Sequence, residues 1–331
     1  MLTTEGSQTP RRIGEPADGV RRGQALLEVS ALPAFLFCAV VVILIAITEP
    51  DTMSAFGVEL LLTAAIPAVF AALAQSFVIL AGDIDLGLGS AMGLANVLAA
   101  TLLVSHLAEG VAALVGLIAA YAAIGWLVET FHVPAVIVTL GASFVWLGIA
   151  LILQPEPGGS APNWLSRVYD LVLPVVPEPV YIVIAAAGVA YWIVSRTGYG
   201  VVMRAFGNRP SALTQVGRSR LRARTGLYSL AGICVVLGGL AVTAVSNGSD
   251  ANASATYTLS SIAAAVIGGA EFSGGIASPT GAVLGGLALA FMSSLLSFLN
   301  VSTNYQSAVL GLCLIAVFGL RRALKRGRGD S

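Results

Sequence analysis

Residues 195–224 read SRTGYGVVMRAFGNRPSALTQVGRSRLRAR and hold seven of the 17 Lys and Arg residues in this 331-residue chain. The other cations are grouped as tightly, with four among the first 22 residues, five in 321–328, and Arg167 alone. Between these groups the chain is largely apolar. Lys and Arg that flank transmembrane helices stay on the cytoplasmic side and set the orientation of the protein. The grouping therefore predicts a multispanning membrane protein whose N-terminal tail, 196–224 segment and C-terminus lie in the cytoplasm.

The overall composition supports insertion in a lipid membrane. The chain is 57% hydrophobic and 10% charged, whereas an average soluble domain is about 25% charged. Its 37 glycines suit helices that approach one another closely in lipid. The formal net charge of zero gives no support for a nucleic-acid partner. We expect an all-α, multi-pass membrane protein.

Ten apolar segments predict about ten transmembrane helices. Six precede the 196–224 segment and four follow it, so each cationic group lies on the same side of the membrane. We expect a disordered cytoplasmic tail over 1–30, a transmembrane domain over 31–320 and a basic cytoplasmic tail over 321–331. The segment 258–270 is too short to span the membrane at 1.5 Å per residue. We expect irregular backbone in this segment and near 82–90. The segments are 31–48, 59–82, 85–105, 108–128, 133–153, 178–195, 225–245, 258–270, 279–299 and 304–320. The outer loop 154–177 is expected to form either a short amphipathic element that meets a partner or a mere connection.

Two glycine-rich polar stretches interrupt the apolar pattern. The first is AGDIDLGLGS at 81–90, and the second is GGAEFSGG at 268–275. Broken helices at matching positions in two halves are typical of a translocation site, because non-helical backbone at membrane depth must line a cavity or be buried in protein. The glycines concerned are Gly82, Gly87, Gly89, Gly268, Gly269, Gly274 and Gly275.

Six polar residues are candidates for the translocation path: Gln75, Asp83, Asp85, Ser90, Asn96 and Thr139. Two alternatives stay open. Asp83 or Asp85 could instead cap the following helix, as Pro279 could open another. Gln75, Asn96 and Thr139 could equally form hydrogen bonds between helices.

No pattern predicts catalysis, a cofactor or a metal site. His106 and His132 lie at predicted span ends, and the three cysteines (Cys38, Cys234 and Cys313) are isolated in apolar runs. No Gly-x-x-x-x-Gly-Lys-Ser/Thr sequence is present to bind a nucleotide. If ATP drives the protein, a partner must hydrolyse it.

The 196–224 segment holds more order than a solvated loop requires. Asn208, Pro210 and Ser211 form a helix-start signal and Gly217 a stop, which predicts a short helix of about two turns. Such a helix could dock on a cytoplasmic partner, and the alternative is a charged, solvated loop. The residues assigned to this docking are Asn208, Ser211, Ala212, Leu213 and Gly217.

Four stretches in order resemble the permease subunits of bacterial ribose-type (simple-sugar) ABC importers, over about residues 55–322. The resemblance implies a ten-helix permease in the bacterial cytoplasmic (inner) membrane. It also implies three partners: a cytoplasmic ATPase with tandem nucleotide domains, a periplasmic or lipoprotein sugar-binding protein, and a second permease copy or paralogue. It also implies that 211–217 matches the coupling-helix pattern. This chain has Gly-Asp-Ile-Asp-Leu-Gly at 82–87 where relatives usually have Gly-Gly-Ile-Asp-Leu-Ser. The stretches are VILAGDIDLGLGSAMG, FHVPAVIVTLGASFVWLGIAL, GYGVVMRAFGNRPSALTQVG and SSIAAAVIGGAEFSGGIASPTGAVLGG.

The solute is expected to be a small neutral sugar or polyol. No Lys or Arg falls inside the ten predicted spans, so none could pair with an anion at low dielectric. Within the same superfamily, a branched-chain amino-acid or nucleoside permease is the alternative. An ion-coupled secondary carrier would need a buried ionisable residue in mid-span, and Asp83, Asp85, Glu109 and Glu129 all lie at predicted span ends. A membrane-embedded enzyme would need a catalytic constellation that the sequence does not show.

Overall fold

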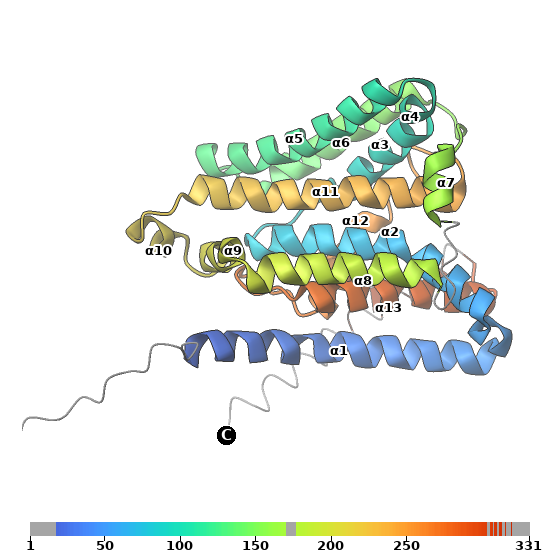
Figure 1. The fold of residues 1–331 in the computed structure, drawn as a ribbon, viewed down its shortest axis with the longest axis horizontal. Coiled ribbons are helices and arrows are strands. Elements are labelled where there is room, and N and C mark those ends of the chain that lie inside the picture. Colours follow the sequence, from blue (N-terminus) through green and yellow to red (C-terminus); the bar gives the residue numbers. More distant parts are fainter. Residues whose placement is uncertain are drawn as a thin grey trace, which may run out of the picture.

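The computed structural model describes residues 18–169 and 177–302, with eight further positions between 305 and 319. In this part of the chain long helices lie side by side and are joined by loops (Figure 1). Four of the expected features lie partly or wholly outside the described residues: the tail over 1–17, residues 170–176 of the outer loop, most of the 304–320 span, and the basic tail over 321–331.

Eight helical spans in the described residues are long and apolar enough to cross a membrane, and they match eight of the ten expected segments. The expected segment 258–270 forms α12 (Tyr257–Ile267), whose 11 residues are too few to span alone, as predicted. The chain is an all-α, multi-pass membrane protein. The spans are α1 (Asp18–Thr48), α2 (Ala55–Leu80), α3 (Leu88–Ala100) with α4 (Leu102–Ser105), α5 (Leu107–Phe131), α6 (Ala135–Leu153), α8 (Glu178–Tyr191) with the π-helical η2 (Trp192–Arg196), α11 (Arg220–Ser246) and α13 (Pro279–Phe298).

Two helices begin earlier than the sequence suggested. α1 begins at Asp18, inside the segment expected to be disordered, where residues 21–28 are mostly good helix formers. α11 begins at Arg220 rather than 225, because the Ser219 hydroxyl accepts the Arg222 N–H at 3.3 Å and caps the helix. The expectation that no cation lies within a span is therefore wrong for the first turns of α11, which include Arg224.

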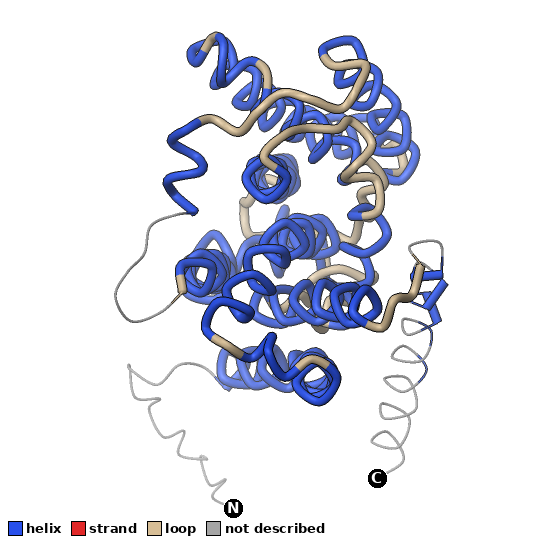
Figure 2. Tube along the Cα trace, turned by 90° about the vertical axis from the view of Figure 1, so that its right-hand side faces the viewer, coloured by secondary structure: helices blue, strands red, loops and turns tan. Residues whose placement is uncertain are grey.

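The core of the bundle is built around α2 and α11. α11 packs against α2, α5 and α3, while α13 packs against α2 and α1. α5 and α6 lie along one side of the bundle and α1 along the opposite side (Figure 1), and Figure 2 shows the same bundle end-on. Apolar side chains on α6 face outward, including Phe144 at 70% exposure and Ile152 at 82%. A helix that is apolar on its outer face suits contact with lipid.

The two ends of the bundle differ in content. The start of α1, α9 (Gly198–Asn208) and α10 (Pro210–Gln215) lie at one end, which we call the cytoplasmic end because it carries the arginine-rich segment (Figure 1). Six spans separate α1's start from α9, as the charge pattern predicted. At the outer end are η1 (Pro50–Met53) and α7 (Asn163–Tyr169), so that of the two alternatives for the 154–177 loop the structure agrees with a short element rather than a mere connection.

Candidate functional site

Both glycine-rich stretches interrupt helices, as predicted. The first glycine segment (81–87) joins α2 to α3, and the second glycine segment (268–278) joins α12 to α13. Gly82 has φ 83°, Gly269 102° and Gly274 80°, a left-handed backbone that residues with a Cβ rarely adopt. Pro279 is the first residue of α13, and the Ser278 hydroxyl accepts the Gly281 N–H at 3.1 Å, so the predicted helix start is confirmed.

The two glycine segments meet each other and α9 at the cytoplasmic end. The Gly275 N–H donates to the Leu80 carbonyl at 3.0 Å. A Cβ atom at Gly274 would lie 3.0 Å from the Gly82 Cα, and one at Gly207 would overlap both the Leu80 carbonyl and the Gly275 nitrogen. Three backbones therefore touch without intervening side chains. We call Gly82, Gly207, Gly274 and Gly275 the glycine junction; sequence reasoning missed this contact with α9.

Asp85 is enclosed in protein at 1% exposure. Its Oδ1 accepts the Gly87 N–H at 2.7 Å, just before α3 begins at Leu88, and its Oδ2 accepts the Tyr121 hydroxyl at 2.9 Å. This geometry matches the capping alternative. Asp83 does not cap α3, because its Oδ2 accepts the Tyr228 hydroxyl of α11 at 3.1 Å.

Gln75 and Thr139 hold the same non-helical stretch from two sides. Thr139 Oγ1 accepts the Leu86 N–H at 3.1 Å. The fully buried Gln75 amide faces the Asp85 backbone, and in the orientation that satisfies both groups its nitrogen lies 3.3 Å from the carbonyl and its oxygen 3.2 Å from the N–H. Three of the six residues predicted for the path thus come together around 85–87. Ser90 lies half-buried in the first turn of α3.

Asn96 lies apart from this group and braces the outer loop. Its side-chain nitrogen donates to Thr243 Oγ1 at 2.9 Å and to the Gly248 carbonyl at 3.0 Å, and its oxygen accepts the Asp250 N–H at 3.1 Å. These bonds match the alternative of hydrogen bonds between helices. Nearby, the Gly89 N–H donates to Thr258 Oγ1 at 3.0 Å, which brings α3 against α12.

A reciprocal tyrosine pair joins α5 to α11, and sequence reasoning did not find it. A Cβ at Gly232 would lie 2.8 Å from the Tyr121 Cβ, and one at Gly125 would lie 2.9 Å from the Tyr228 Cβ. Each ring therefore packs on a glycine of the opposite helix while its hydroxyl bonds an aspartate of the first glycine segment. The signal was present, because both helices contain Tyr-x-x-x-Gly, a spacing that places the two residues on one helix face.

The predicted cytoplasmic helix is present, with one correction. α10 covers Pro210–Gln215, and Gly217 with φ 70° follows it. Asn208 does not start α10: it is the last residue of α9, and its side chain donates to the Arg204 carbonyl at 3.1 Å. Pro210 fits the first turn of α10. Because proline has no N–H, it cannot continue the hydrogen-bonding pattern of α9, and the two helices are therefore distinct. Ser211, Ala212 and Leu213 lie within α10.

A family model described as "Branched-chain amino acid transport system / permease component" matches residues 57–318. The chain belongs to this permease family. The permease is 29% identical to the ribose import permease protein RbsC of Bacillus subtilis (strain 168), over 88% of this chain and 92% of the relative. It is 26% identical to the D-allose transport system permease protein AlsC of Escherichia coli (strain K12), over 78% of this chain and 81% of that protein. The autoinducer 2 import system permease protein LsrC of Shigella flexneri is 30% identical, over 78% of each chain.

No solved structure matches the permease. Its place in the family makes it a transport component rather than a catalyst.

Proposed function

We propose that the permease is the membrane subunit of an ATP-driven (ABC) importer for a small neutral sugar or polyol. Its near-full-length relatives import ribose, D-allose and autoinducer 2 by their descriptions, which favours a sugar-like solute over the amino acids named in the family description. A separate cytoplasmic ATPase with tandem nucleotide domains hydrolyses ATP, and an extracytoplasmic binding protein delivers the solute. A second permease copy or paralogue completes the pathway.

The charges of the described residues favour a neutral solute. Between residues 31 and 195 the chain has one Lys or Arg, Arg167, and it lies in α7 outside the spans. Arg224 enters α11, but its side chain lies 3.4 Å from carboxylate oxygens of both Asp83 and Glu129. An anionic solute would need an unpaired cation at membrane depth, whereas a polyol needs only uncharged hydrogen-bonding groups.

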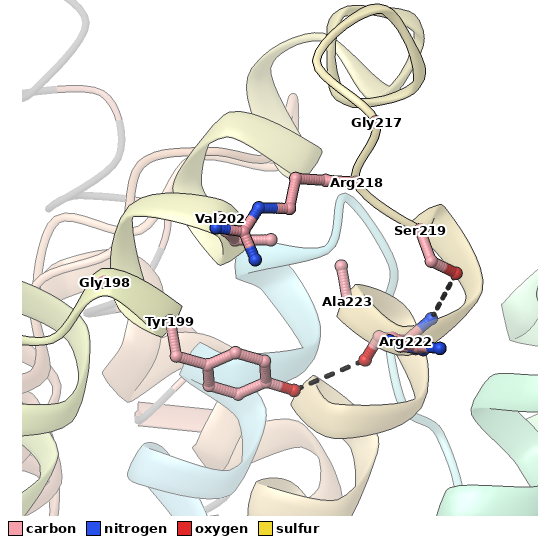
Figure 3. Close-up of a pocket in the computed structure, with 8 residues that line it drawn as sticks. All are labelled: Gly198, Tyr199, Val202, Gly217, Arg218, Ser219, Arg222 and Ala223. Atoms are coloured by element: carbon pink, nitrogen blue, oxygen red, sulfur yellow. Dashed lines mark hydrogen bonds between the residues drawn. The ribbon is translucent and has the colours of Figure 1, made fainter.

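The docking site proposed for the ATPase is α10 and the cavity beside it. Leu213 is 2% exposed and anchors α10, while Val216 is 71% exposed. A cavity of about 610 Å³ lies between α9 and the start of α11, with Gly217 and Arg218 at its edge (Figure 3). Burial raises the pKa of the Tyr199 phenol, so its hydroxyl stays protonated and donates to the Arg222 carbonyl at 3.3 Å across this cavity.

One observation carries the mechanism. The cytoplasmic segment that presents α10 also reaches the glycine junction through Gly207, so a displacement of α10 by the ATPase would act on both glycine segments at once. Where two backbones touch directly, no side chain lies between them to change its rotamer, so a small shift of one backbone cannot be absorbed. In the proposed transport cycle the permease alternates between outward-open and inward-open forms, because ATP closes the ATPase and hydrolysis releases it.

The assembly is tested by purifying the permease with its ATPase and adding the binding protein. We expect a stable complex whose ATPase rate rises with liganded binding protein. Failure of the ATPase to co-purify, together with solute movement driven by an ion gradient, would support a secondary carrier instead.

A further inference from the structure

Charged side chains at the cytoplasmic end of α5 and α11 form a chain with the first glycine segment. Arg224 Nε lies 3.4 Å from Asp83 Oδ2, and Arg224 Nη1 lies 3.4 Å from Glu129 Oε2. Arg220 Nε lies 2.9 Å from Glu129 Oε1. The side chains of Arg224, Asp83 and Glu129 are 16%, 11% and 9% exposed. We call this group the arginine bridge.

Arg224 also contacts the segment that leads to α10. Its guanidinium lies over the Phe206 ring, 5.2 Å from the ring centroid, a cation–π contact. Phe206 is fully buried in α9 and immediately precedes Gly207 of the glycine junction. One side chain therefore touches the docking segment on one side and the first glycine segment on the other.

Stability alone is a weak reason for such a group. A largely buried ion pair loses as much hydration as it gains in attraction, and well-packed apolar residues often stabilise a protein as well or better. An arginine shared by two carboxylates from different elements has an alternative use, because it can keep one partner when the other moves away. Asp83 belongs to the first glycine segment, whereas Glu129 ends α5.

We propose that Arg224 is a positioning residue that couples α9 and α10 to the first glycine segment through Asp83, with Glu129 and Arg220 holding its other side. In the described conformation the bridge ties the first glycine segment to α11. When the ATPase moves α10, Phe206 shifts and Arg224 releases Asp83 while keeping Glu129. The inference rests on the proposed function and assigns the residue that transmits the motion.

The variants are Asp83→Asn, Arg224→Gln, the double variant, and Arg224→Lys, which restores the charge. Arg196→Gln is the matched control, since Arg196 ends η2 at the same end of the bundle, is exposed, does not line the cavity beside α10, and forms no ion pair among the described residues. Each is reconstituted in liposomes with the complete complex, and the ATP hydrolysed per solute imported is measured. Ribose is the probe solute.

We expect Asp83→Asn and Arg224→Gln to raise this ratio by about fivefold or more, the lower range of coupling between sites. The double variant should match either single variant, as expected for residues that act as a pair, and Arg224→Lys should restore part of the coupling. Arg196→Gln should keep the wild-type ratio.

Asp83→Asn is isosteric and disturbs folding least. If the assembled Asp83→Asn complex hydrolyses as much ATP per imported solute as the wild type, this inference is overturned while the proposed function stands. An equal loss of coupling in Arg196→Gln would also overturn this inference. Absence of ATP-dependent uptake of ribose and of other neutral pentoses, hexoses and polyols by the wild-type complex would instead overturn the proposed function, and this inference with it.

Discussion

At the scale of single residues, the site depends on glycines as much as on larger residues, because a glycine has no side chain and leaves room for its neighbours. Tyr121 and Tyr228 can reach the aspartates of the first glycine segment because Gly232 and Gly125 leave room for their rings. Adding volume at these glycines forces the tyrosines to shift, since packed interiors have little space to absorb it.

Gly232→Ala is therefore expected to lower the free energy of unfolding by about 1–3 kcal/mol, the usual cost of overpacking. Thermal unfolding of the purified permease in detergent would measure it. Gly116→Ala, on α5, is the matched control because a Cβ there meets nothing within 4 Å. Equal melting temperatures for the two variants would contradict the packing described for the tyrosine pair.

Asn96→Ala should also destabilise the protein, by about 1–3 kcal/mol, because it leaves buried groups of Thr243 and Asp250 without their partner. The exposed Asn252 in the same outer loop provides the control. If Asn252→Ala costs as much as Asn96→Ala in the same unfolding assay, the bracing role of Asn96 is wrong.

At the scale of elements, the sequence predicted the spans well and their contacts poorly. Apolar runs and cationic flanks locate eight of the spans, and Pro210 with Gly217 locates α10, since these signals are local. The start of α11 was missed because arginine both marks the cytoplasmic side and favours helix. The glycine junction joins segments that lie 67 or more residues apart in the sequence, and no periodicity within a helix reports such a contact.

The orientation of the elements is tested by single cysteines in a background without Cys38, Cys234 and Cys313. Cysteines at Ser160 and Asn252 lie in exposed outer loops and should react with an impermeant thiol reagent in intact cells. A cysteine at the exposed Ser219 should react only after lysis. Labelling of the Ser219 site from outside would mean that the topology is the reverse of the one proposed and that α10 does not lie in the cytoplasm.

The docking role of α10 is tested at Gly217, where an added Cβ meets nothing within 4 Å although φ is 70°. Gly217→Trp should leave the permease in the membrane but abolish co-purification with the ATPase, because a docking surface tolerates little added volume. Gly217→Ala carries the same backbone strain with little volume and should retain most of the binding. Loss of the ATPase in both variants would attribute the effect to strain, and retention in both would remove Gly217 from the interface.

At the scale of the whole molecule, the two ends of the bundle differ in charge. The middle of the bundle is uncharged apart from groups that are enclosed in protein. Arginines gather at the cytoplasmic end, where α10 is exposed, and the glycine junction lies beside them. Polar contacts deeper in the bundle, around Asp85 and Asn96, are satisfied within the protein. This arrangement suits a machine driven from the cytoplasm that carries an uncharged solute.

The most direct test of this account is uptake by proteoliposomes that contain the complete complex, with ATP on the side of the ATPase and labelled solute delivered by the binding protein. We predict ATP-dependent accumulation of a neutral pentose, hexose or polyol, with no uptake when an ion gradient replaces ATP. Robust ATP-dependent uptake of a sugar phosphate, a dicarboxylate or a branched-chain amino acid, with neutral sugars excluded, would contradict the account.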